Sequence, residues 1–382
     1  NDNGKITSYL ERYKVFVKVL FQEYADRQFT VYILNSGELL PREKERILEK
    51  IKHFNDDADG ADILDMTEGA GMGIMLSLKL MEQVGISSEA LTLGVHKGMT
   101  VAKFSFDYTS IHAAPYNVIA EEILKIVNTL PKYPDNIKNL LAKLLQPDIK
   151  VQDVAEEISK DPSLSTDLLK LVNSAKFSLQ RKIGSIKEAI NFVGIKGLKN
   201  LLYSYGAMQA IDSRFGSVNQ VWEHSYKTAR VASLIAEKFK LNKKDDESFT
   251  AGLLHDMGKI VLMSFDLNKA KSIDEVCRQR GIDLPVMEEL IMGLSHAKIG
   301  GEIAEYWDFP SSLISAITYH HEPIMAETDH ELVYTVNLAN YIASVKNKSE
   351  LNAYLIEPDV RDFFKINSTY DIVKFAETLG SY

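Results

Sequence analysis

The sequence contains very little of what marks secreted or membrane-spanning proteins. Cys277 is the single cysteine among 382 residues, which excludes an internal disulfide and fits a reducing compartment. No uninterrupted apolar stretch reaches the length of a membrane span, and no apolar region lies between a basic start and a cleavage site. We therefore expect a cytoplasmic protein without a membrane partner. The chain starts at Asn1 rather than at methionine, which leaves room for further residues upstream.

An excess of positive charge is also missing. With 44 Lys and Arg against 53 Asp and Glu, the net charge is -9, so the chain as a whole does not attract nucleic acid or an anionic membrane. Nucleic acid is therefore not an expected partner, although a local basic patch is compatible with this balance. Hydrophobic residues make up 45%, as in soluble globular proteins, and the length predicts two or three domains.

The first part of the chain mixes strand and helix patterns. Apolar residues alternate in 29–34, 91–95 and 102–106, which predicts strands, and 96–99 is typical of a hairpin turn between the last two. Helical periodicity fills 42–52 and 74–84. We predict an α/β domain over residues 1–112.

Helical periodicity replaces the strand pattern from about Asn117 onward. Asp161-Pro162 predicts a helix start, with the aspartate as cap and the proline in the first turn. Longer helices are predicted over 229–239 and 252–263, and Trp222 and Trp307 are expected in the core. The predicted fold class is a multidomain α/β plus all-α protein, in which residues 113–382 form an all-helical domain with a C-terminal helical extension.

Six of the nine histidines lie between positions 224 and 330. Imidazole nitrogen and carboxylate oxygen are ligands for iron, manganese or zinc, and such an ion lowers the pKa of a bound water and polarises phosphoryl oxygen. Lys259 lies on the same helix face as Asp256 and could pair with a phosphate. We expect convergence in space; separate structural roles for single histidines are the alternative. His53, His112 and His330 have no distinctive context and are expected on surface loops. The distinctive contexts are those of His224, His255-Asp256, His296 and His320-His321.

The order of these residues resembles the HD superfamily of metal-dependent phosphohydrolases. The flanking sequence narrows the resemblance to the HDOD family, the HD-related output domains of bacterial signalling proteins, over about 117–345. The segments that carry it include 130–131, 158–164, 168–175, 183–190, 251–259 and 307–310. The resemblance implies a divalent metal held by His224, His255, Asp256, His296, His320, His321 and Asn340.

Two departures from catalytic relatives bear on activity. Asn340 stands where catalytic HD enzymes have an aspartate ligand, and Glu322-Pro323 follows His321 in place of the Gly-Tyr-Pro signature of the HD-GYP relatives. HDOD domains are regarded as regulatory modules, which implies signalling proteins as partners. The alternative is a phosphohydrolase acting on a nucleotide or cyclic nucleotide, with Asp256 and Lys259 as catalytic residues. No organic cofactor is expected, and a homodimer is compatible with either interpretation.

Residues 29–106 also resemble the later half of the ATP-binding fold of the GHKL group. Gly69, Gly71 and Gly73 precede a predicted helix, where backbone amides can approach a phosphate. Asn35 stands where that group has its adenine-binding aspartate. The resemblance implies cofactor binding at these glycines, and the alternative is a plain sensor or dimerisation module.

Overall fold

The computed structural model describes most of the chain after residue 117 and the strands before it. The described ranges are 17–23, 28–35, 86–96, 99–107, 118–146, 149–173, 182–216, 219–241, 245–280 and 282–379, with single helical residues at 42, 45, 47, 49, 78 and 81. Two compact units are formed, one by 1–119, 275–282 and 289–293, the other by 120–274, 283–288 and 294–382.

An antiparallel sheet of four strands forms the described part of the N-terminal region. The strands are β1 (Val17–Glu23), β2 (Gln28–Asn35), β3 (Leu91–His96) and β4 (Met99–Asp107), in the order β1-β2-β4-β3. The three predicted strands are confirmed within β2, β3 and β4. In the β3–β4 hairpin His96 pairs with Met99, as the predicted turn requires. β1 was not predicted, because Leu20 interrupts the alternation of Val17, Val19 and Phe21.

Several predicted features of this region lie outside the described residues. They include Gly69, Gly71 and Gly73, as well as His53 and His112. The resemblance to the GHKL fold therefore stays a prediction. Within 42–52 and 74–84, each residue that the structure describes is helical, in agreement with the predicted helices.

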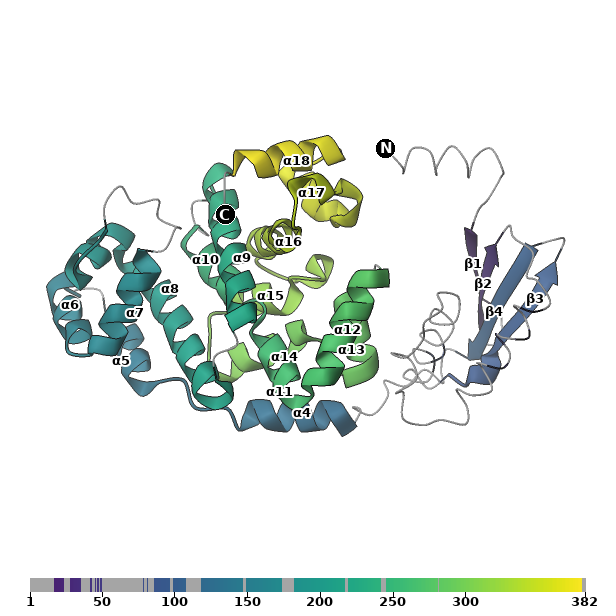
Figure 1. Ribbon diagram of the computed structural model, residues 1–382, viewed down its shortest axis with the longest axis horizontal. Helices are drawn as coiled ribbons and strands as arrows, with labels where there is room; N and C mark the ends of the chain where they lie inside the picture. Colours follow the sequence, from purple (N-terminus) through teal and green to yellow (C-terminus); the bar gives the residue numbers. More distant parts are fainter. Residues whose placement is uncertain are drawn as a thin grey trace. The chain divides into compact units, whose positions relative to one another are not determined.

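From Val118 onward the described chain is helical (Figure 1). Short 3-10 turns lie at Pro323–Met325 (η5), Lys348–Glu350 (η6) and Ala353–Leu355 (η7). Among the described residues, no helix combines the length and hydrophobicity needed to cross a bilayer. The helices are α4 (Val118–Asn128), α5 (Asp135–Lys143), α6 (Val151–Ser159), α7 (Pro162–Val172), α8 (Ile186–Phe215), α9 (Asn219–Lys238), α10 (Asp245–Leu254), α11 (Met257–Phe265), α12 (Leu267–Arg280), α13 (Leu284–Met292), α14 (His296–Tyr306), α15 (Ser311–Tyr319), α16 (His330–Ser344), α17 (Pro358–Phe364) and α18 (Thr369–Thr378).

Side-chain caps and one glycine explain where several helices begin or bend. Asp161 accepts a hydrogen bond from the Leu164 amide at 3.1 Å, with Pro162 in the first turn, so the predicted start of α7 is confirmed. Ser185 and Ser295 cap α8 and α14 in the same way. Gly194, with φ of 72°, kinks α8, a conformation that glycine adopts without a Cβ clash.

The helix predicted over 252–263 is two helices. α10 ends at Leu254 and α11 begins at Met257, and Asp256 between them has non-helical φ and ψ of -98° and 7°. Apolar residues on both sides of this break have the periodicity of a continuous helix, so the sequence pattern did not reveal it. The break turns the His255 and Asp256 side chains inward, where they are 0% and 1% exposed.

Helices α9, α10 and α16 pack against one another. α9 contacts α10 and α16, while α14 contacts α15 and α11. Trp222 and Trp307 are buried, as predicted. His330 is exposed as expected, but it is the first residue of α16 rather than part of a loop. The predicted C-terminal extension is α17 and α18, which pack on α9 and α16 through a cluster that includes Ile235, Ile342 and Ile372.

Gly258 allows the first turn of α11 to lie directly against α14. A Cβ added at Gly258 would lie 2.0 Å from the His296 carbonyl oxygen and 2.7 Å from the Gly300 amide nitrogen. Both atoms belong to backbone, which cannot rotate away. The close approach brings Asp256, just before α11, near His296, the first residue of α14.

We expect Gly258→Ala to lower the free energy of unfolding by about 1–3 kcal/mol or more, because the added methyl forces α11 and α14 apart. Gly184→Ala is the matched control, since a Cβ there meets nothing within 4 Å. Chemical denaturation measures both. Equal stability of the two variants would contradict the close packing.

Candidate metal centre

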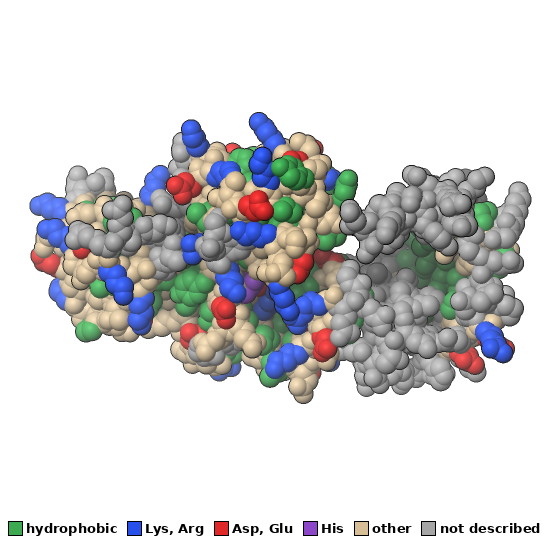
Figure 2. Space-filling view, turned by 45° about the horizontal axis from the view of Figure 1, so that its top comes forward, with side chains coloured by type: hydrophobic (Ala, Val, Ile, Leu, Met, Phe, Trp, Pro, Cys, Tyr) green, Lys and Arg blue, Asp and Glu red, His purple; other side chains and the backbone are tan. Residues whose placement is uncertain are grey.

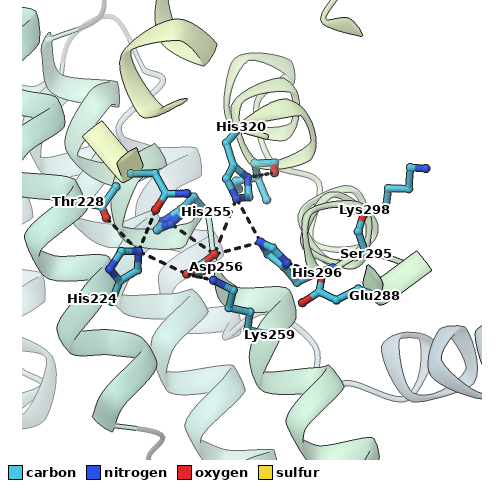
Figure 3. Close-up of polar contacts among 12 residues, drawn as sticks. His224, Thr228, His255, Asp256, Lys259, Glu288, Ser295, His296, Lys298 and His320 are labelled. Carbon is cyan, nitrogen blue, oxygen red and sulfur yellow. Dashed lines mark hydrogen bonds and ion pairs between the residues drawn. The ribbon is translucent and has the colours of Figure 1, made fainter. Parts of the chain in front are cut away.

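Five structural elements bring the predicted ligand residues together, and Figure 3 shows His224, His255, His296 and His320 around Asp256. His224 comes from α9, His255 and Asp256 from the α10–α11 break, and His296 from the first residue of α14. His320 and His321 follow the last turn of α15, and Asn340 lies on α16. Two overlapping groups have ligand atoms within 4.8 Å of one another: Asp256, His296, His320 and His321; and His224, His255 and Asp256. The predicted convergence of these residues is therefore observed.

Asp256 lies at the centre of the cluster. Its Oδ1 is 3.3 Å from His296 Nε2, 3.4 Å from His255 Nε2 and 3.7 Å from His320 Nε2. Its Oδ2 accepts from Lys259 Nζ at 2.8 Å and lies 3.7 Å from His224 Nε2. The two carboxylate oxygens thus face different partners, one the buried imidazoles and the other Lys259.

In His255, His296 and His320 the Nδ1 atom, on the side of the ring away from Asp256, faces an acceptor. These contacts indicate which ring nitrogen carries the proton. His255 Nδ1 is 2.8 Å from the Gly252 carbonyl, and His320 Nδ1 is 2.7 Å from the Ile317 carbonyl. A carbonyl can only accept, so both Nδ1 atoms donate and both Nε2 atoms of the neutral rings carry lone pairs. His296 Nδ1 faces the Glu288 carboxylate at 2.5 Å, which favours the same tautomer. Metal-bound histidines typically have such acceptors behind them.

The inner nitrogens of His255 and His320 face Asp256 Oδ1 without a hydrogen to donate to it. His296 Nε2 and His320 Nε2 are 3.3 Å apart, and Asp256 Oδ1 is a further acceptor at the same point. Among the described residues, His255 Nε2, Asp256 Oδ1 and His321 Nε2 are buried atoms without a hydrogen-bond partner. Ligands about 2.1 Å from one ion lie about 3.0–3.4 Å apart. The separations of 3.3 Å from His296 Nε2 to Asp256 Oδ1 and to His320 Nε2 fit this range, and the 3.7 Å between His320 Nε2 and Asp256 Oδ1 is slightly longer.

Burial keeps three of the imidazoles neutral. It lowers the pKa of His255 to about 4. Burial, together with the neighbouring His321, holds the pKa of His320 well below its ordinary value, and burial beside His296 does the same for His321. A neutral imidazole is the form that binds a metal, so these residues need not lose a proton at pH 7.

Asp256 is charged in spite of its burial. Burial alone would raise the pKa of its carboxyl, but His255 and Lys259 beside it hold that pKa well below its ordinary value. Burial would also lower the pKa of Lys259, yet Asp256 raises it. The charged Asp256–Lys259 pair gives the centre one fixed negative charge next to the histidine lone pairs.

Glu288 on α13 is a site residue that the sequence analysis missed. Its Oε2 accepts from both the backbone amide of His296, at 2.8 Å, and the His296 ring. Burial alone would lower the pKa of His296, but the charge of Glu288 outweighs it and raises that pKa. Glu288 and Glu289 are adjacent in the sequence, and no sequence signal distinguishes the one that turns toward His296.

The His224 side of the cluster differs from the rest. His224 Nε2 is 2.9 Å from Asn340 Oδ1, which accepts its hydrogen, and 3.5 Å from the Thr228 hydroxyl. The His224 side chain is 25% exposed, whereas those of His255, His296 and His320 are 0% exposed. The cluster therefore has a buried part, with unpaired lone pairs, and an accessible part at His224.

Comparison with known proteins agrees with this geometry. Residues 130–323, more than half of the chain, match the HDOD domain. The chain belongs to the HDOD domain family. The match contains every predicted ligand residue except Asn340, and it confirms the HDOD resemblance noted in the sequence.

Similar proteins come from several bacteria. An uncharacterised protein of Treponema pallidum is 28% identical over 372 residues, which cover 96% of this chain and 72% of that protein. A Shewanella amazonensis crystal structure, provisionally named a phosphohydrolase, is 25% identical, with a TM-score of 0.53 over 68% of this chain and 94% of its own. An HDOD domain protein of unknown function from Geobacter sulfurreducens shares the fold, with 24% identity and a TM-score of 0.52 over 69% and 89% of the two chains.

We expect Glu288→Gln in this HDOD protein to weaken divalent metal binding about 10–100-fold, because the neutral amide makes the His296 ring a poorer ligand. Titration with zinc and manganese measures the affinity. Glu305→Gln on the same helix as His296 is the matched control, since its side chain is exposed. Unchanged affinity in Glu288→Gln would show that Glu288 has no influence on the centre.

Proposed function

We propose that this protein is a bacterial signal-transduction output module whose HDOD domain acts through contacts with other signalling proteins. One divalent ion, held in the buried part of the cluster, ties α10–α11, α14 and α15 into a single rigid unit. The observation that carries this proposal is the buried group of Asp256, His296, His320 and His321, whose ligand atoms all lie within 4.8 Å of one another. A cation relieves their mutual repulsion.

The donor set indicates which ions fit. Three imidazole nitrogens and one carboxylate oxygen suit zinc, iron or manganese, whereas calcium and magnesium favour sets made of oxygen alone. Asp256, His296, His320 and His321 would hold the ion, because their ligand atoms lie within 4.8 Å of one another, whereas His255 belongs to the second group with His224 and Asp256. Bound there, the ion supplies positive charge and a Lewis acid.

Burial and charge favour a structural role over catalysis. A catalytic ion needs an open position that substrate can reach, and the central ligands are 0–1% exposed. Asn340 contributes no charge on the accessible side, where a second ion would need it. Regulation by contact with other proteins, including a second copy of the chain, requires no turnover. We propose that the protein works in the cytoplasm and does not act on nucleic acid.

A second candidate function is a metal-dependent phosphohydrolase acting on a nucleotide or cyclic nucleotide. Lys259 favours it, because its Nζ lies 2.8 Å from Asp256 and its side chain is 25% exposed. In that function Lys259 would bind a phosphate oxygen and offset its developing charge. His224 and Asn340 would orient the same substrate at the accessible side.

We expect the protein purified without chelator to contain about one divalent ion per chain, and Asp256→Asn to lose it, because the only carboxylate of the donor set becomes neutral. Elemental analysis measures the content, and His330→Ala is the control with an exposed histidine. At free metal 100 times the dissociation constant, removing the ion should lower stability by about 2.7 kcal/mol.

Hydrolysis assays with linear and cyclic nucleotides separate the two candidates. The regulatory proposal expects no turnover from the metal-loaded chain. Turnover that disappears in Asp256→Asn would overturn it in favour of the phosphohydrolase. A protein that takes up no zinc, iron or manganese would contradict both.

We expect Asn340→Asp to raise the metal content from about one toward two ions per chain, because a carboxylate beside His224 supplies the charge that a second cation needs. The His224 Nε2 to Asn340 Oδ1 distance of 2.9 Å places the new group correctly. Asn128→Asp at the end of α4 is the control, since it makes the same charge change on an exposed side chain. An unchanged number of bound ions in Asn340→Asp would contradict the proposal that the missing charge at Asn340 prevents a second ion from binding.

A further inference from the structure

A cavity of about 960 Å³ opens beside His224 in the helical unit. Its walls come from α9, from the C-terminal end of α16 with the following η6, and from α18. His224 reaches both this cavity and the metal centre, because its Nε2 contacts Asn340 and lies 3.7 Å from Asp256 Oδ2. A molecule in the cavity can therefore touch the accessible side of the centre.

The cavity is locally basic on a protein with a net charge of -9. Lys227, Lys346 and Lys348 line it, against Glu223 and Glu377. Figure 2 shows histidine surface in a recess of this unit, with Lys and Arg side chains around it. The lining thus has one positive charge in excess.

The three lysines differ in the partners that their side-chain amino groups already have. Lys227 is 3.3 Å from Glu223, but both side chains are largely exposed, so the pair is weak and exchangeable. Lys348 donates to the Ala376 carbonyl at 3.0 Å. Among the described residues, no partner engages the Lys346 side chain. Lys346 and Lys227 therefore have donors available for an anion.

We propose that this cavity binds a small phosphate-bearing molecule, with the phosphate held by Lys227 and Lys346 and the rest of the molecule directed toward His224. The volume lies in the usual range for small-molecule sites, and lysine is a common point-charge ligand for phosphate. A compact phosphate avoids Glu223 and Glu377, whereas an acidic protein segment would bring further carboxylates against them. The inference rests on the proposed function, because the bound molecule would be a signal that the regulatory domain senses.

Calorimetric titration of the metal-loaded full chain with inorganic pyrophosphate tests the proposal. We expect saturable binding by the unaltered protein and at least about tenfold weaker binding by Lys346→Glu, since attraction becomes repulsion at short range. Lys170→Glu is the matched control: it makes the same charge change on a side chain that is 72% exposed and pairs with Asp167. Metal content is measured before and after each titration.

Three outcomes would overturn the cavity proposal. They are no binding at millimolar pyrophosphate, equal binding by Lys346→Glu and Lys170→Glu, or binding of polyglutamate alone in a Lys346-dependent way. Two further outcomes would contradict the proposed function without contradicting the cavity. Lys346-dependent binding by a chain that never takes up metal supports the cavity and contradicts the metal centre. Release of phosphate from pyrophosphate that is lost both in Asp256→Asn and in Lys346→Glu supports the cavity and contradicts the non-catalytic role.

Discussion

The buried carboxylate of Asp256 is the constraint on which the centre of this protein depends. A charge in an apolar interior is tolerated only with partners, and Lys259 supplies one at 2.8 Å. The second oxygen instead faces three imidazole nitrogens at 3.3–3.7 Å, too far for strong hydrogen bonds and suitable for a shared ion. The helices around Asp256 are arranged so that their ends, rather than their flanks, meet at this oxygen.

Ordinary backbone chemistry prepares the histidines for this role. Helix carbonyls of Gly252 and Ile317 accept from the outer nitrogens of His255 and His320, which leaves the inner nitrogens with lone pairs. At Gly258 the missing Cβ lets α11 and α14 approach closely enough to bring His296 into the same group. The positions of these histidines thus follow from backbone carbonyls near helix ends and from the missing side chain of Gly258.

The two sides of the cluster have different surroundings, and this difference supports the proposed regulatory role. The inner ligands are sealed from solvent, while His224 borders a basic cavity and bonds with Asn340. A site built for turnover would expose its ions to substrate. A site built to hold helices together would have sealed ligands, with a single exposed residue through which a bound molecule can act on the centre.

Much of this was predictable from residue order, and some was not. The helical class, the cap at Asp161 and the convergence of the histidines with Asp256 follow from local patterns and from the resemblance to HDOD proteins. The helix break at Asp256 was missed, because periodicity is the same on both sides of it. The packing alone decided the proton positions, the contact of Glu288 with His296 and the exposure of His224, since each depends on distances between helices that sequence spacing does not encode.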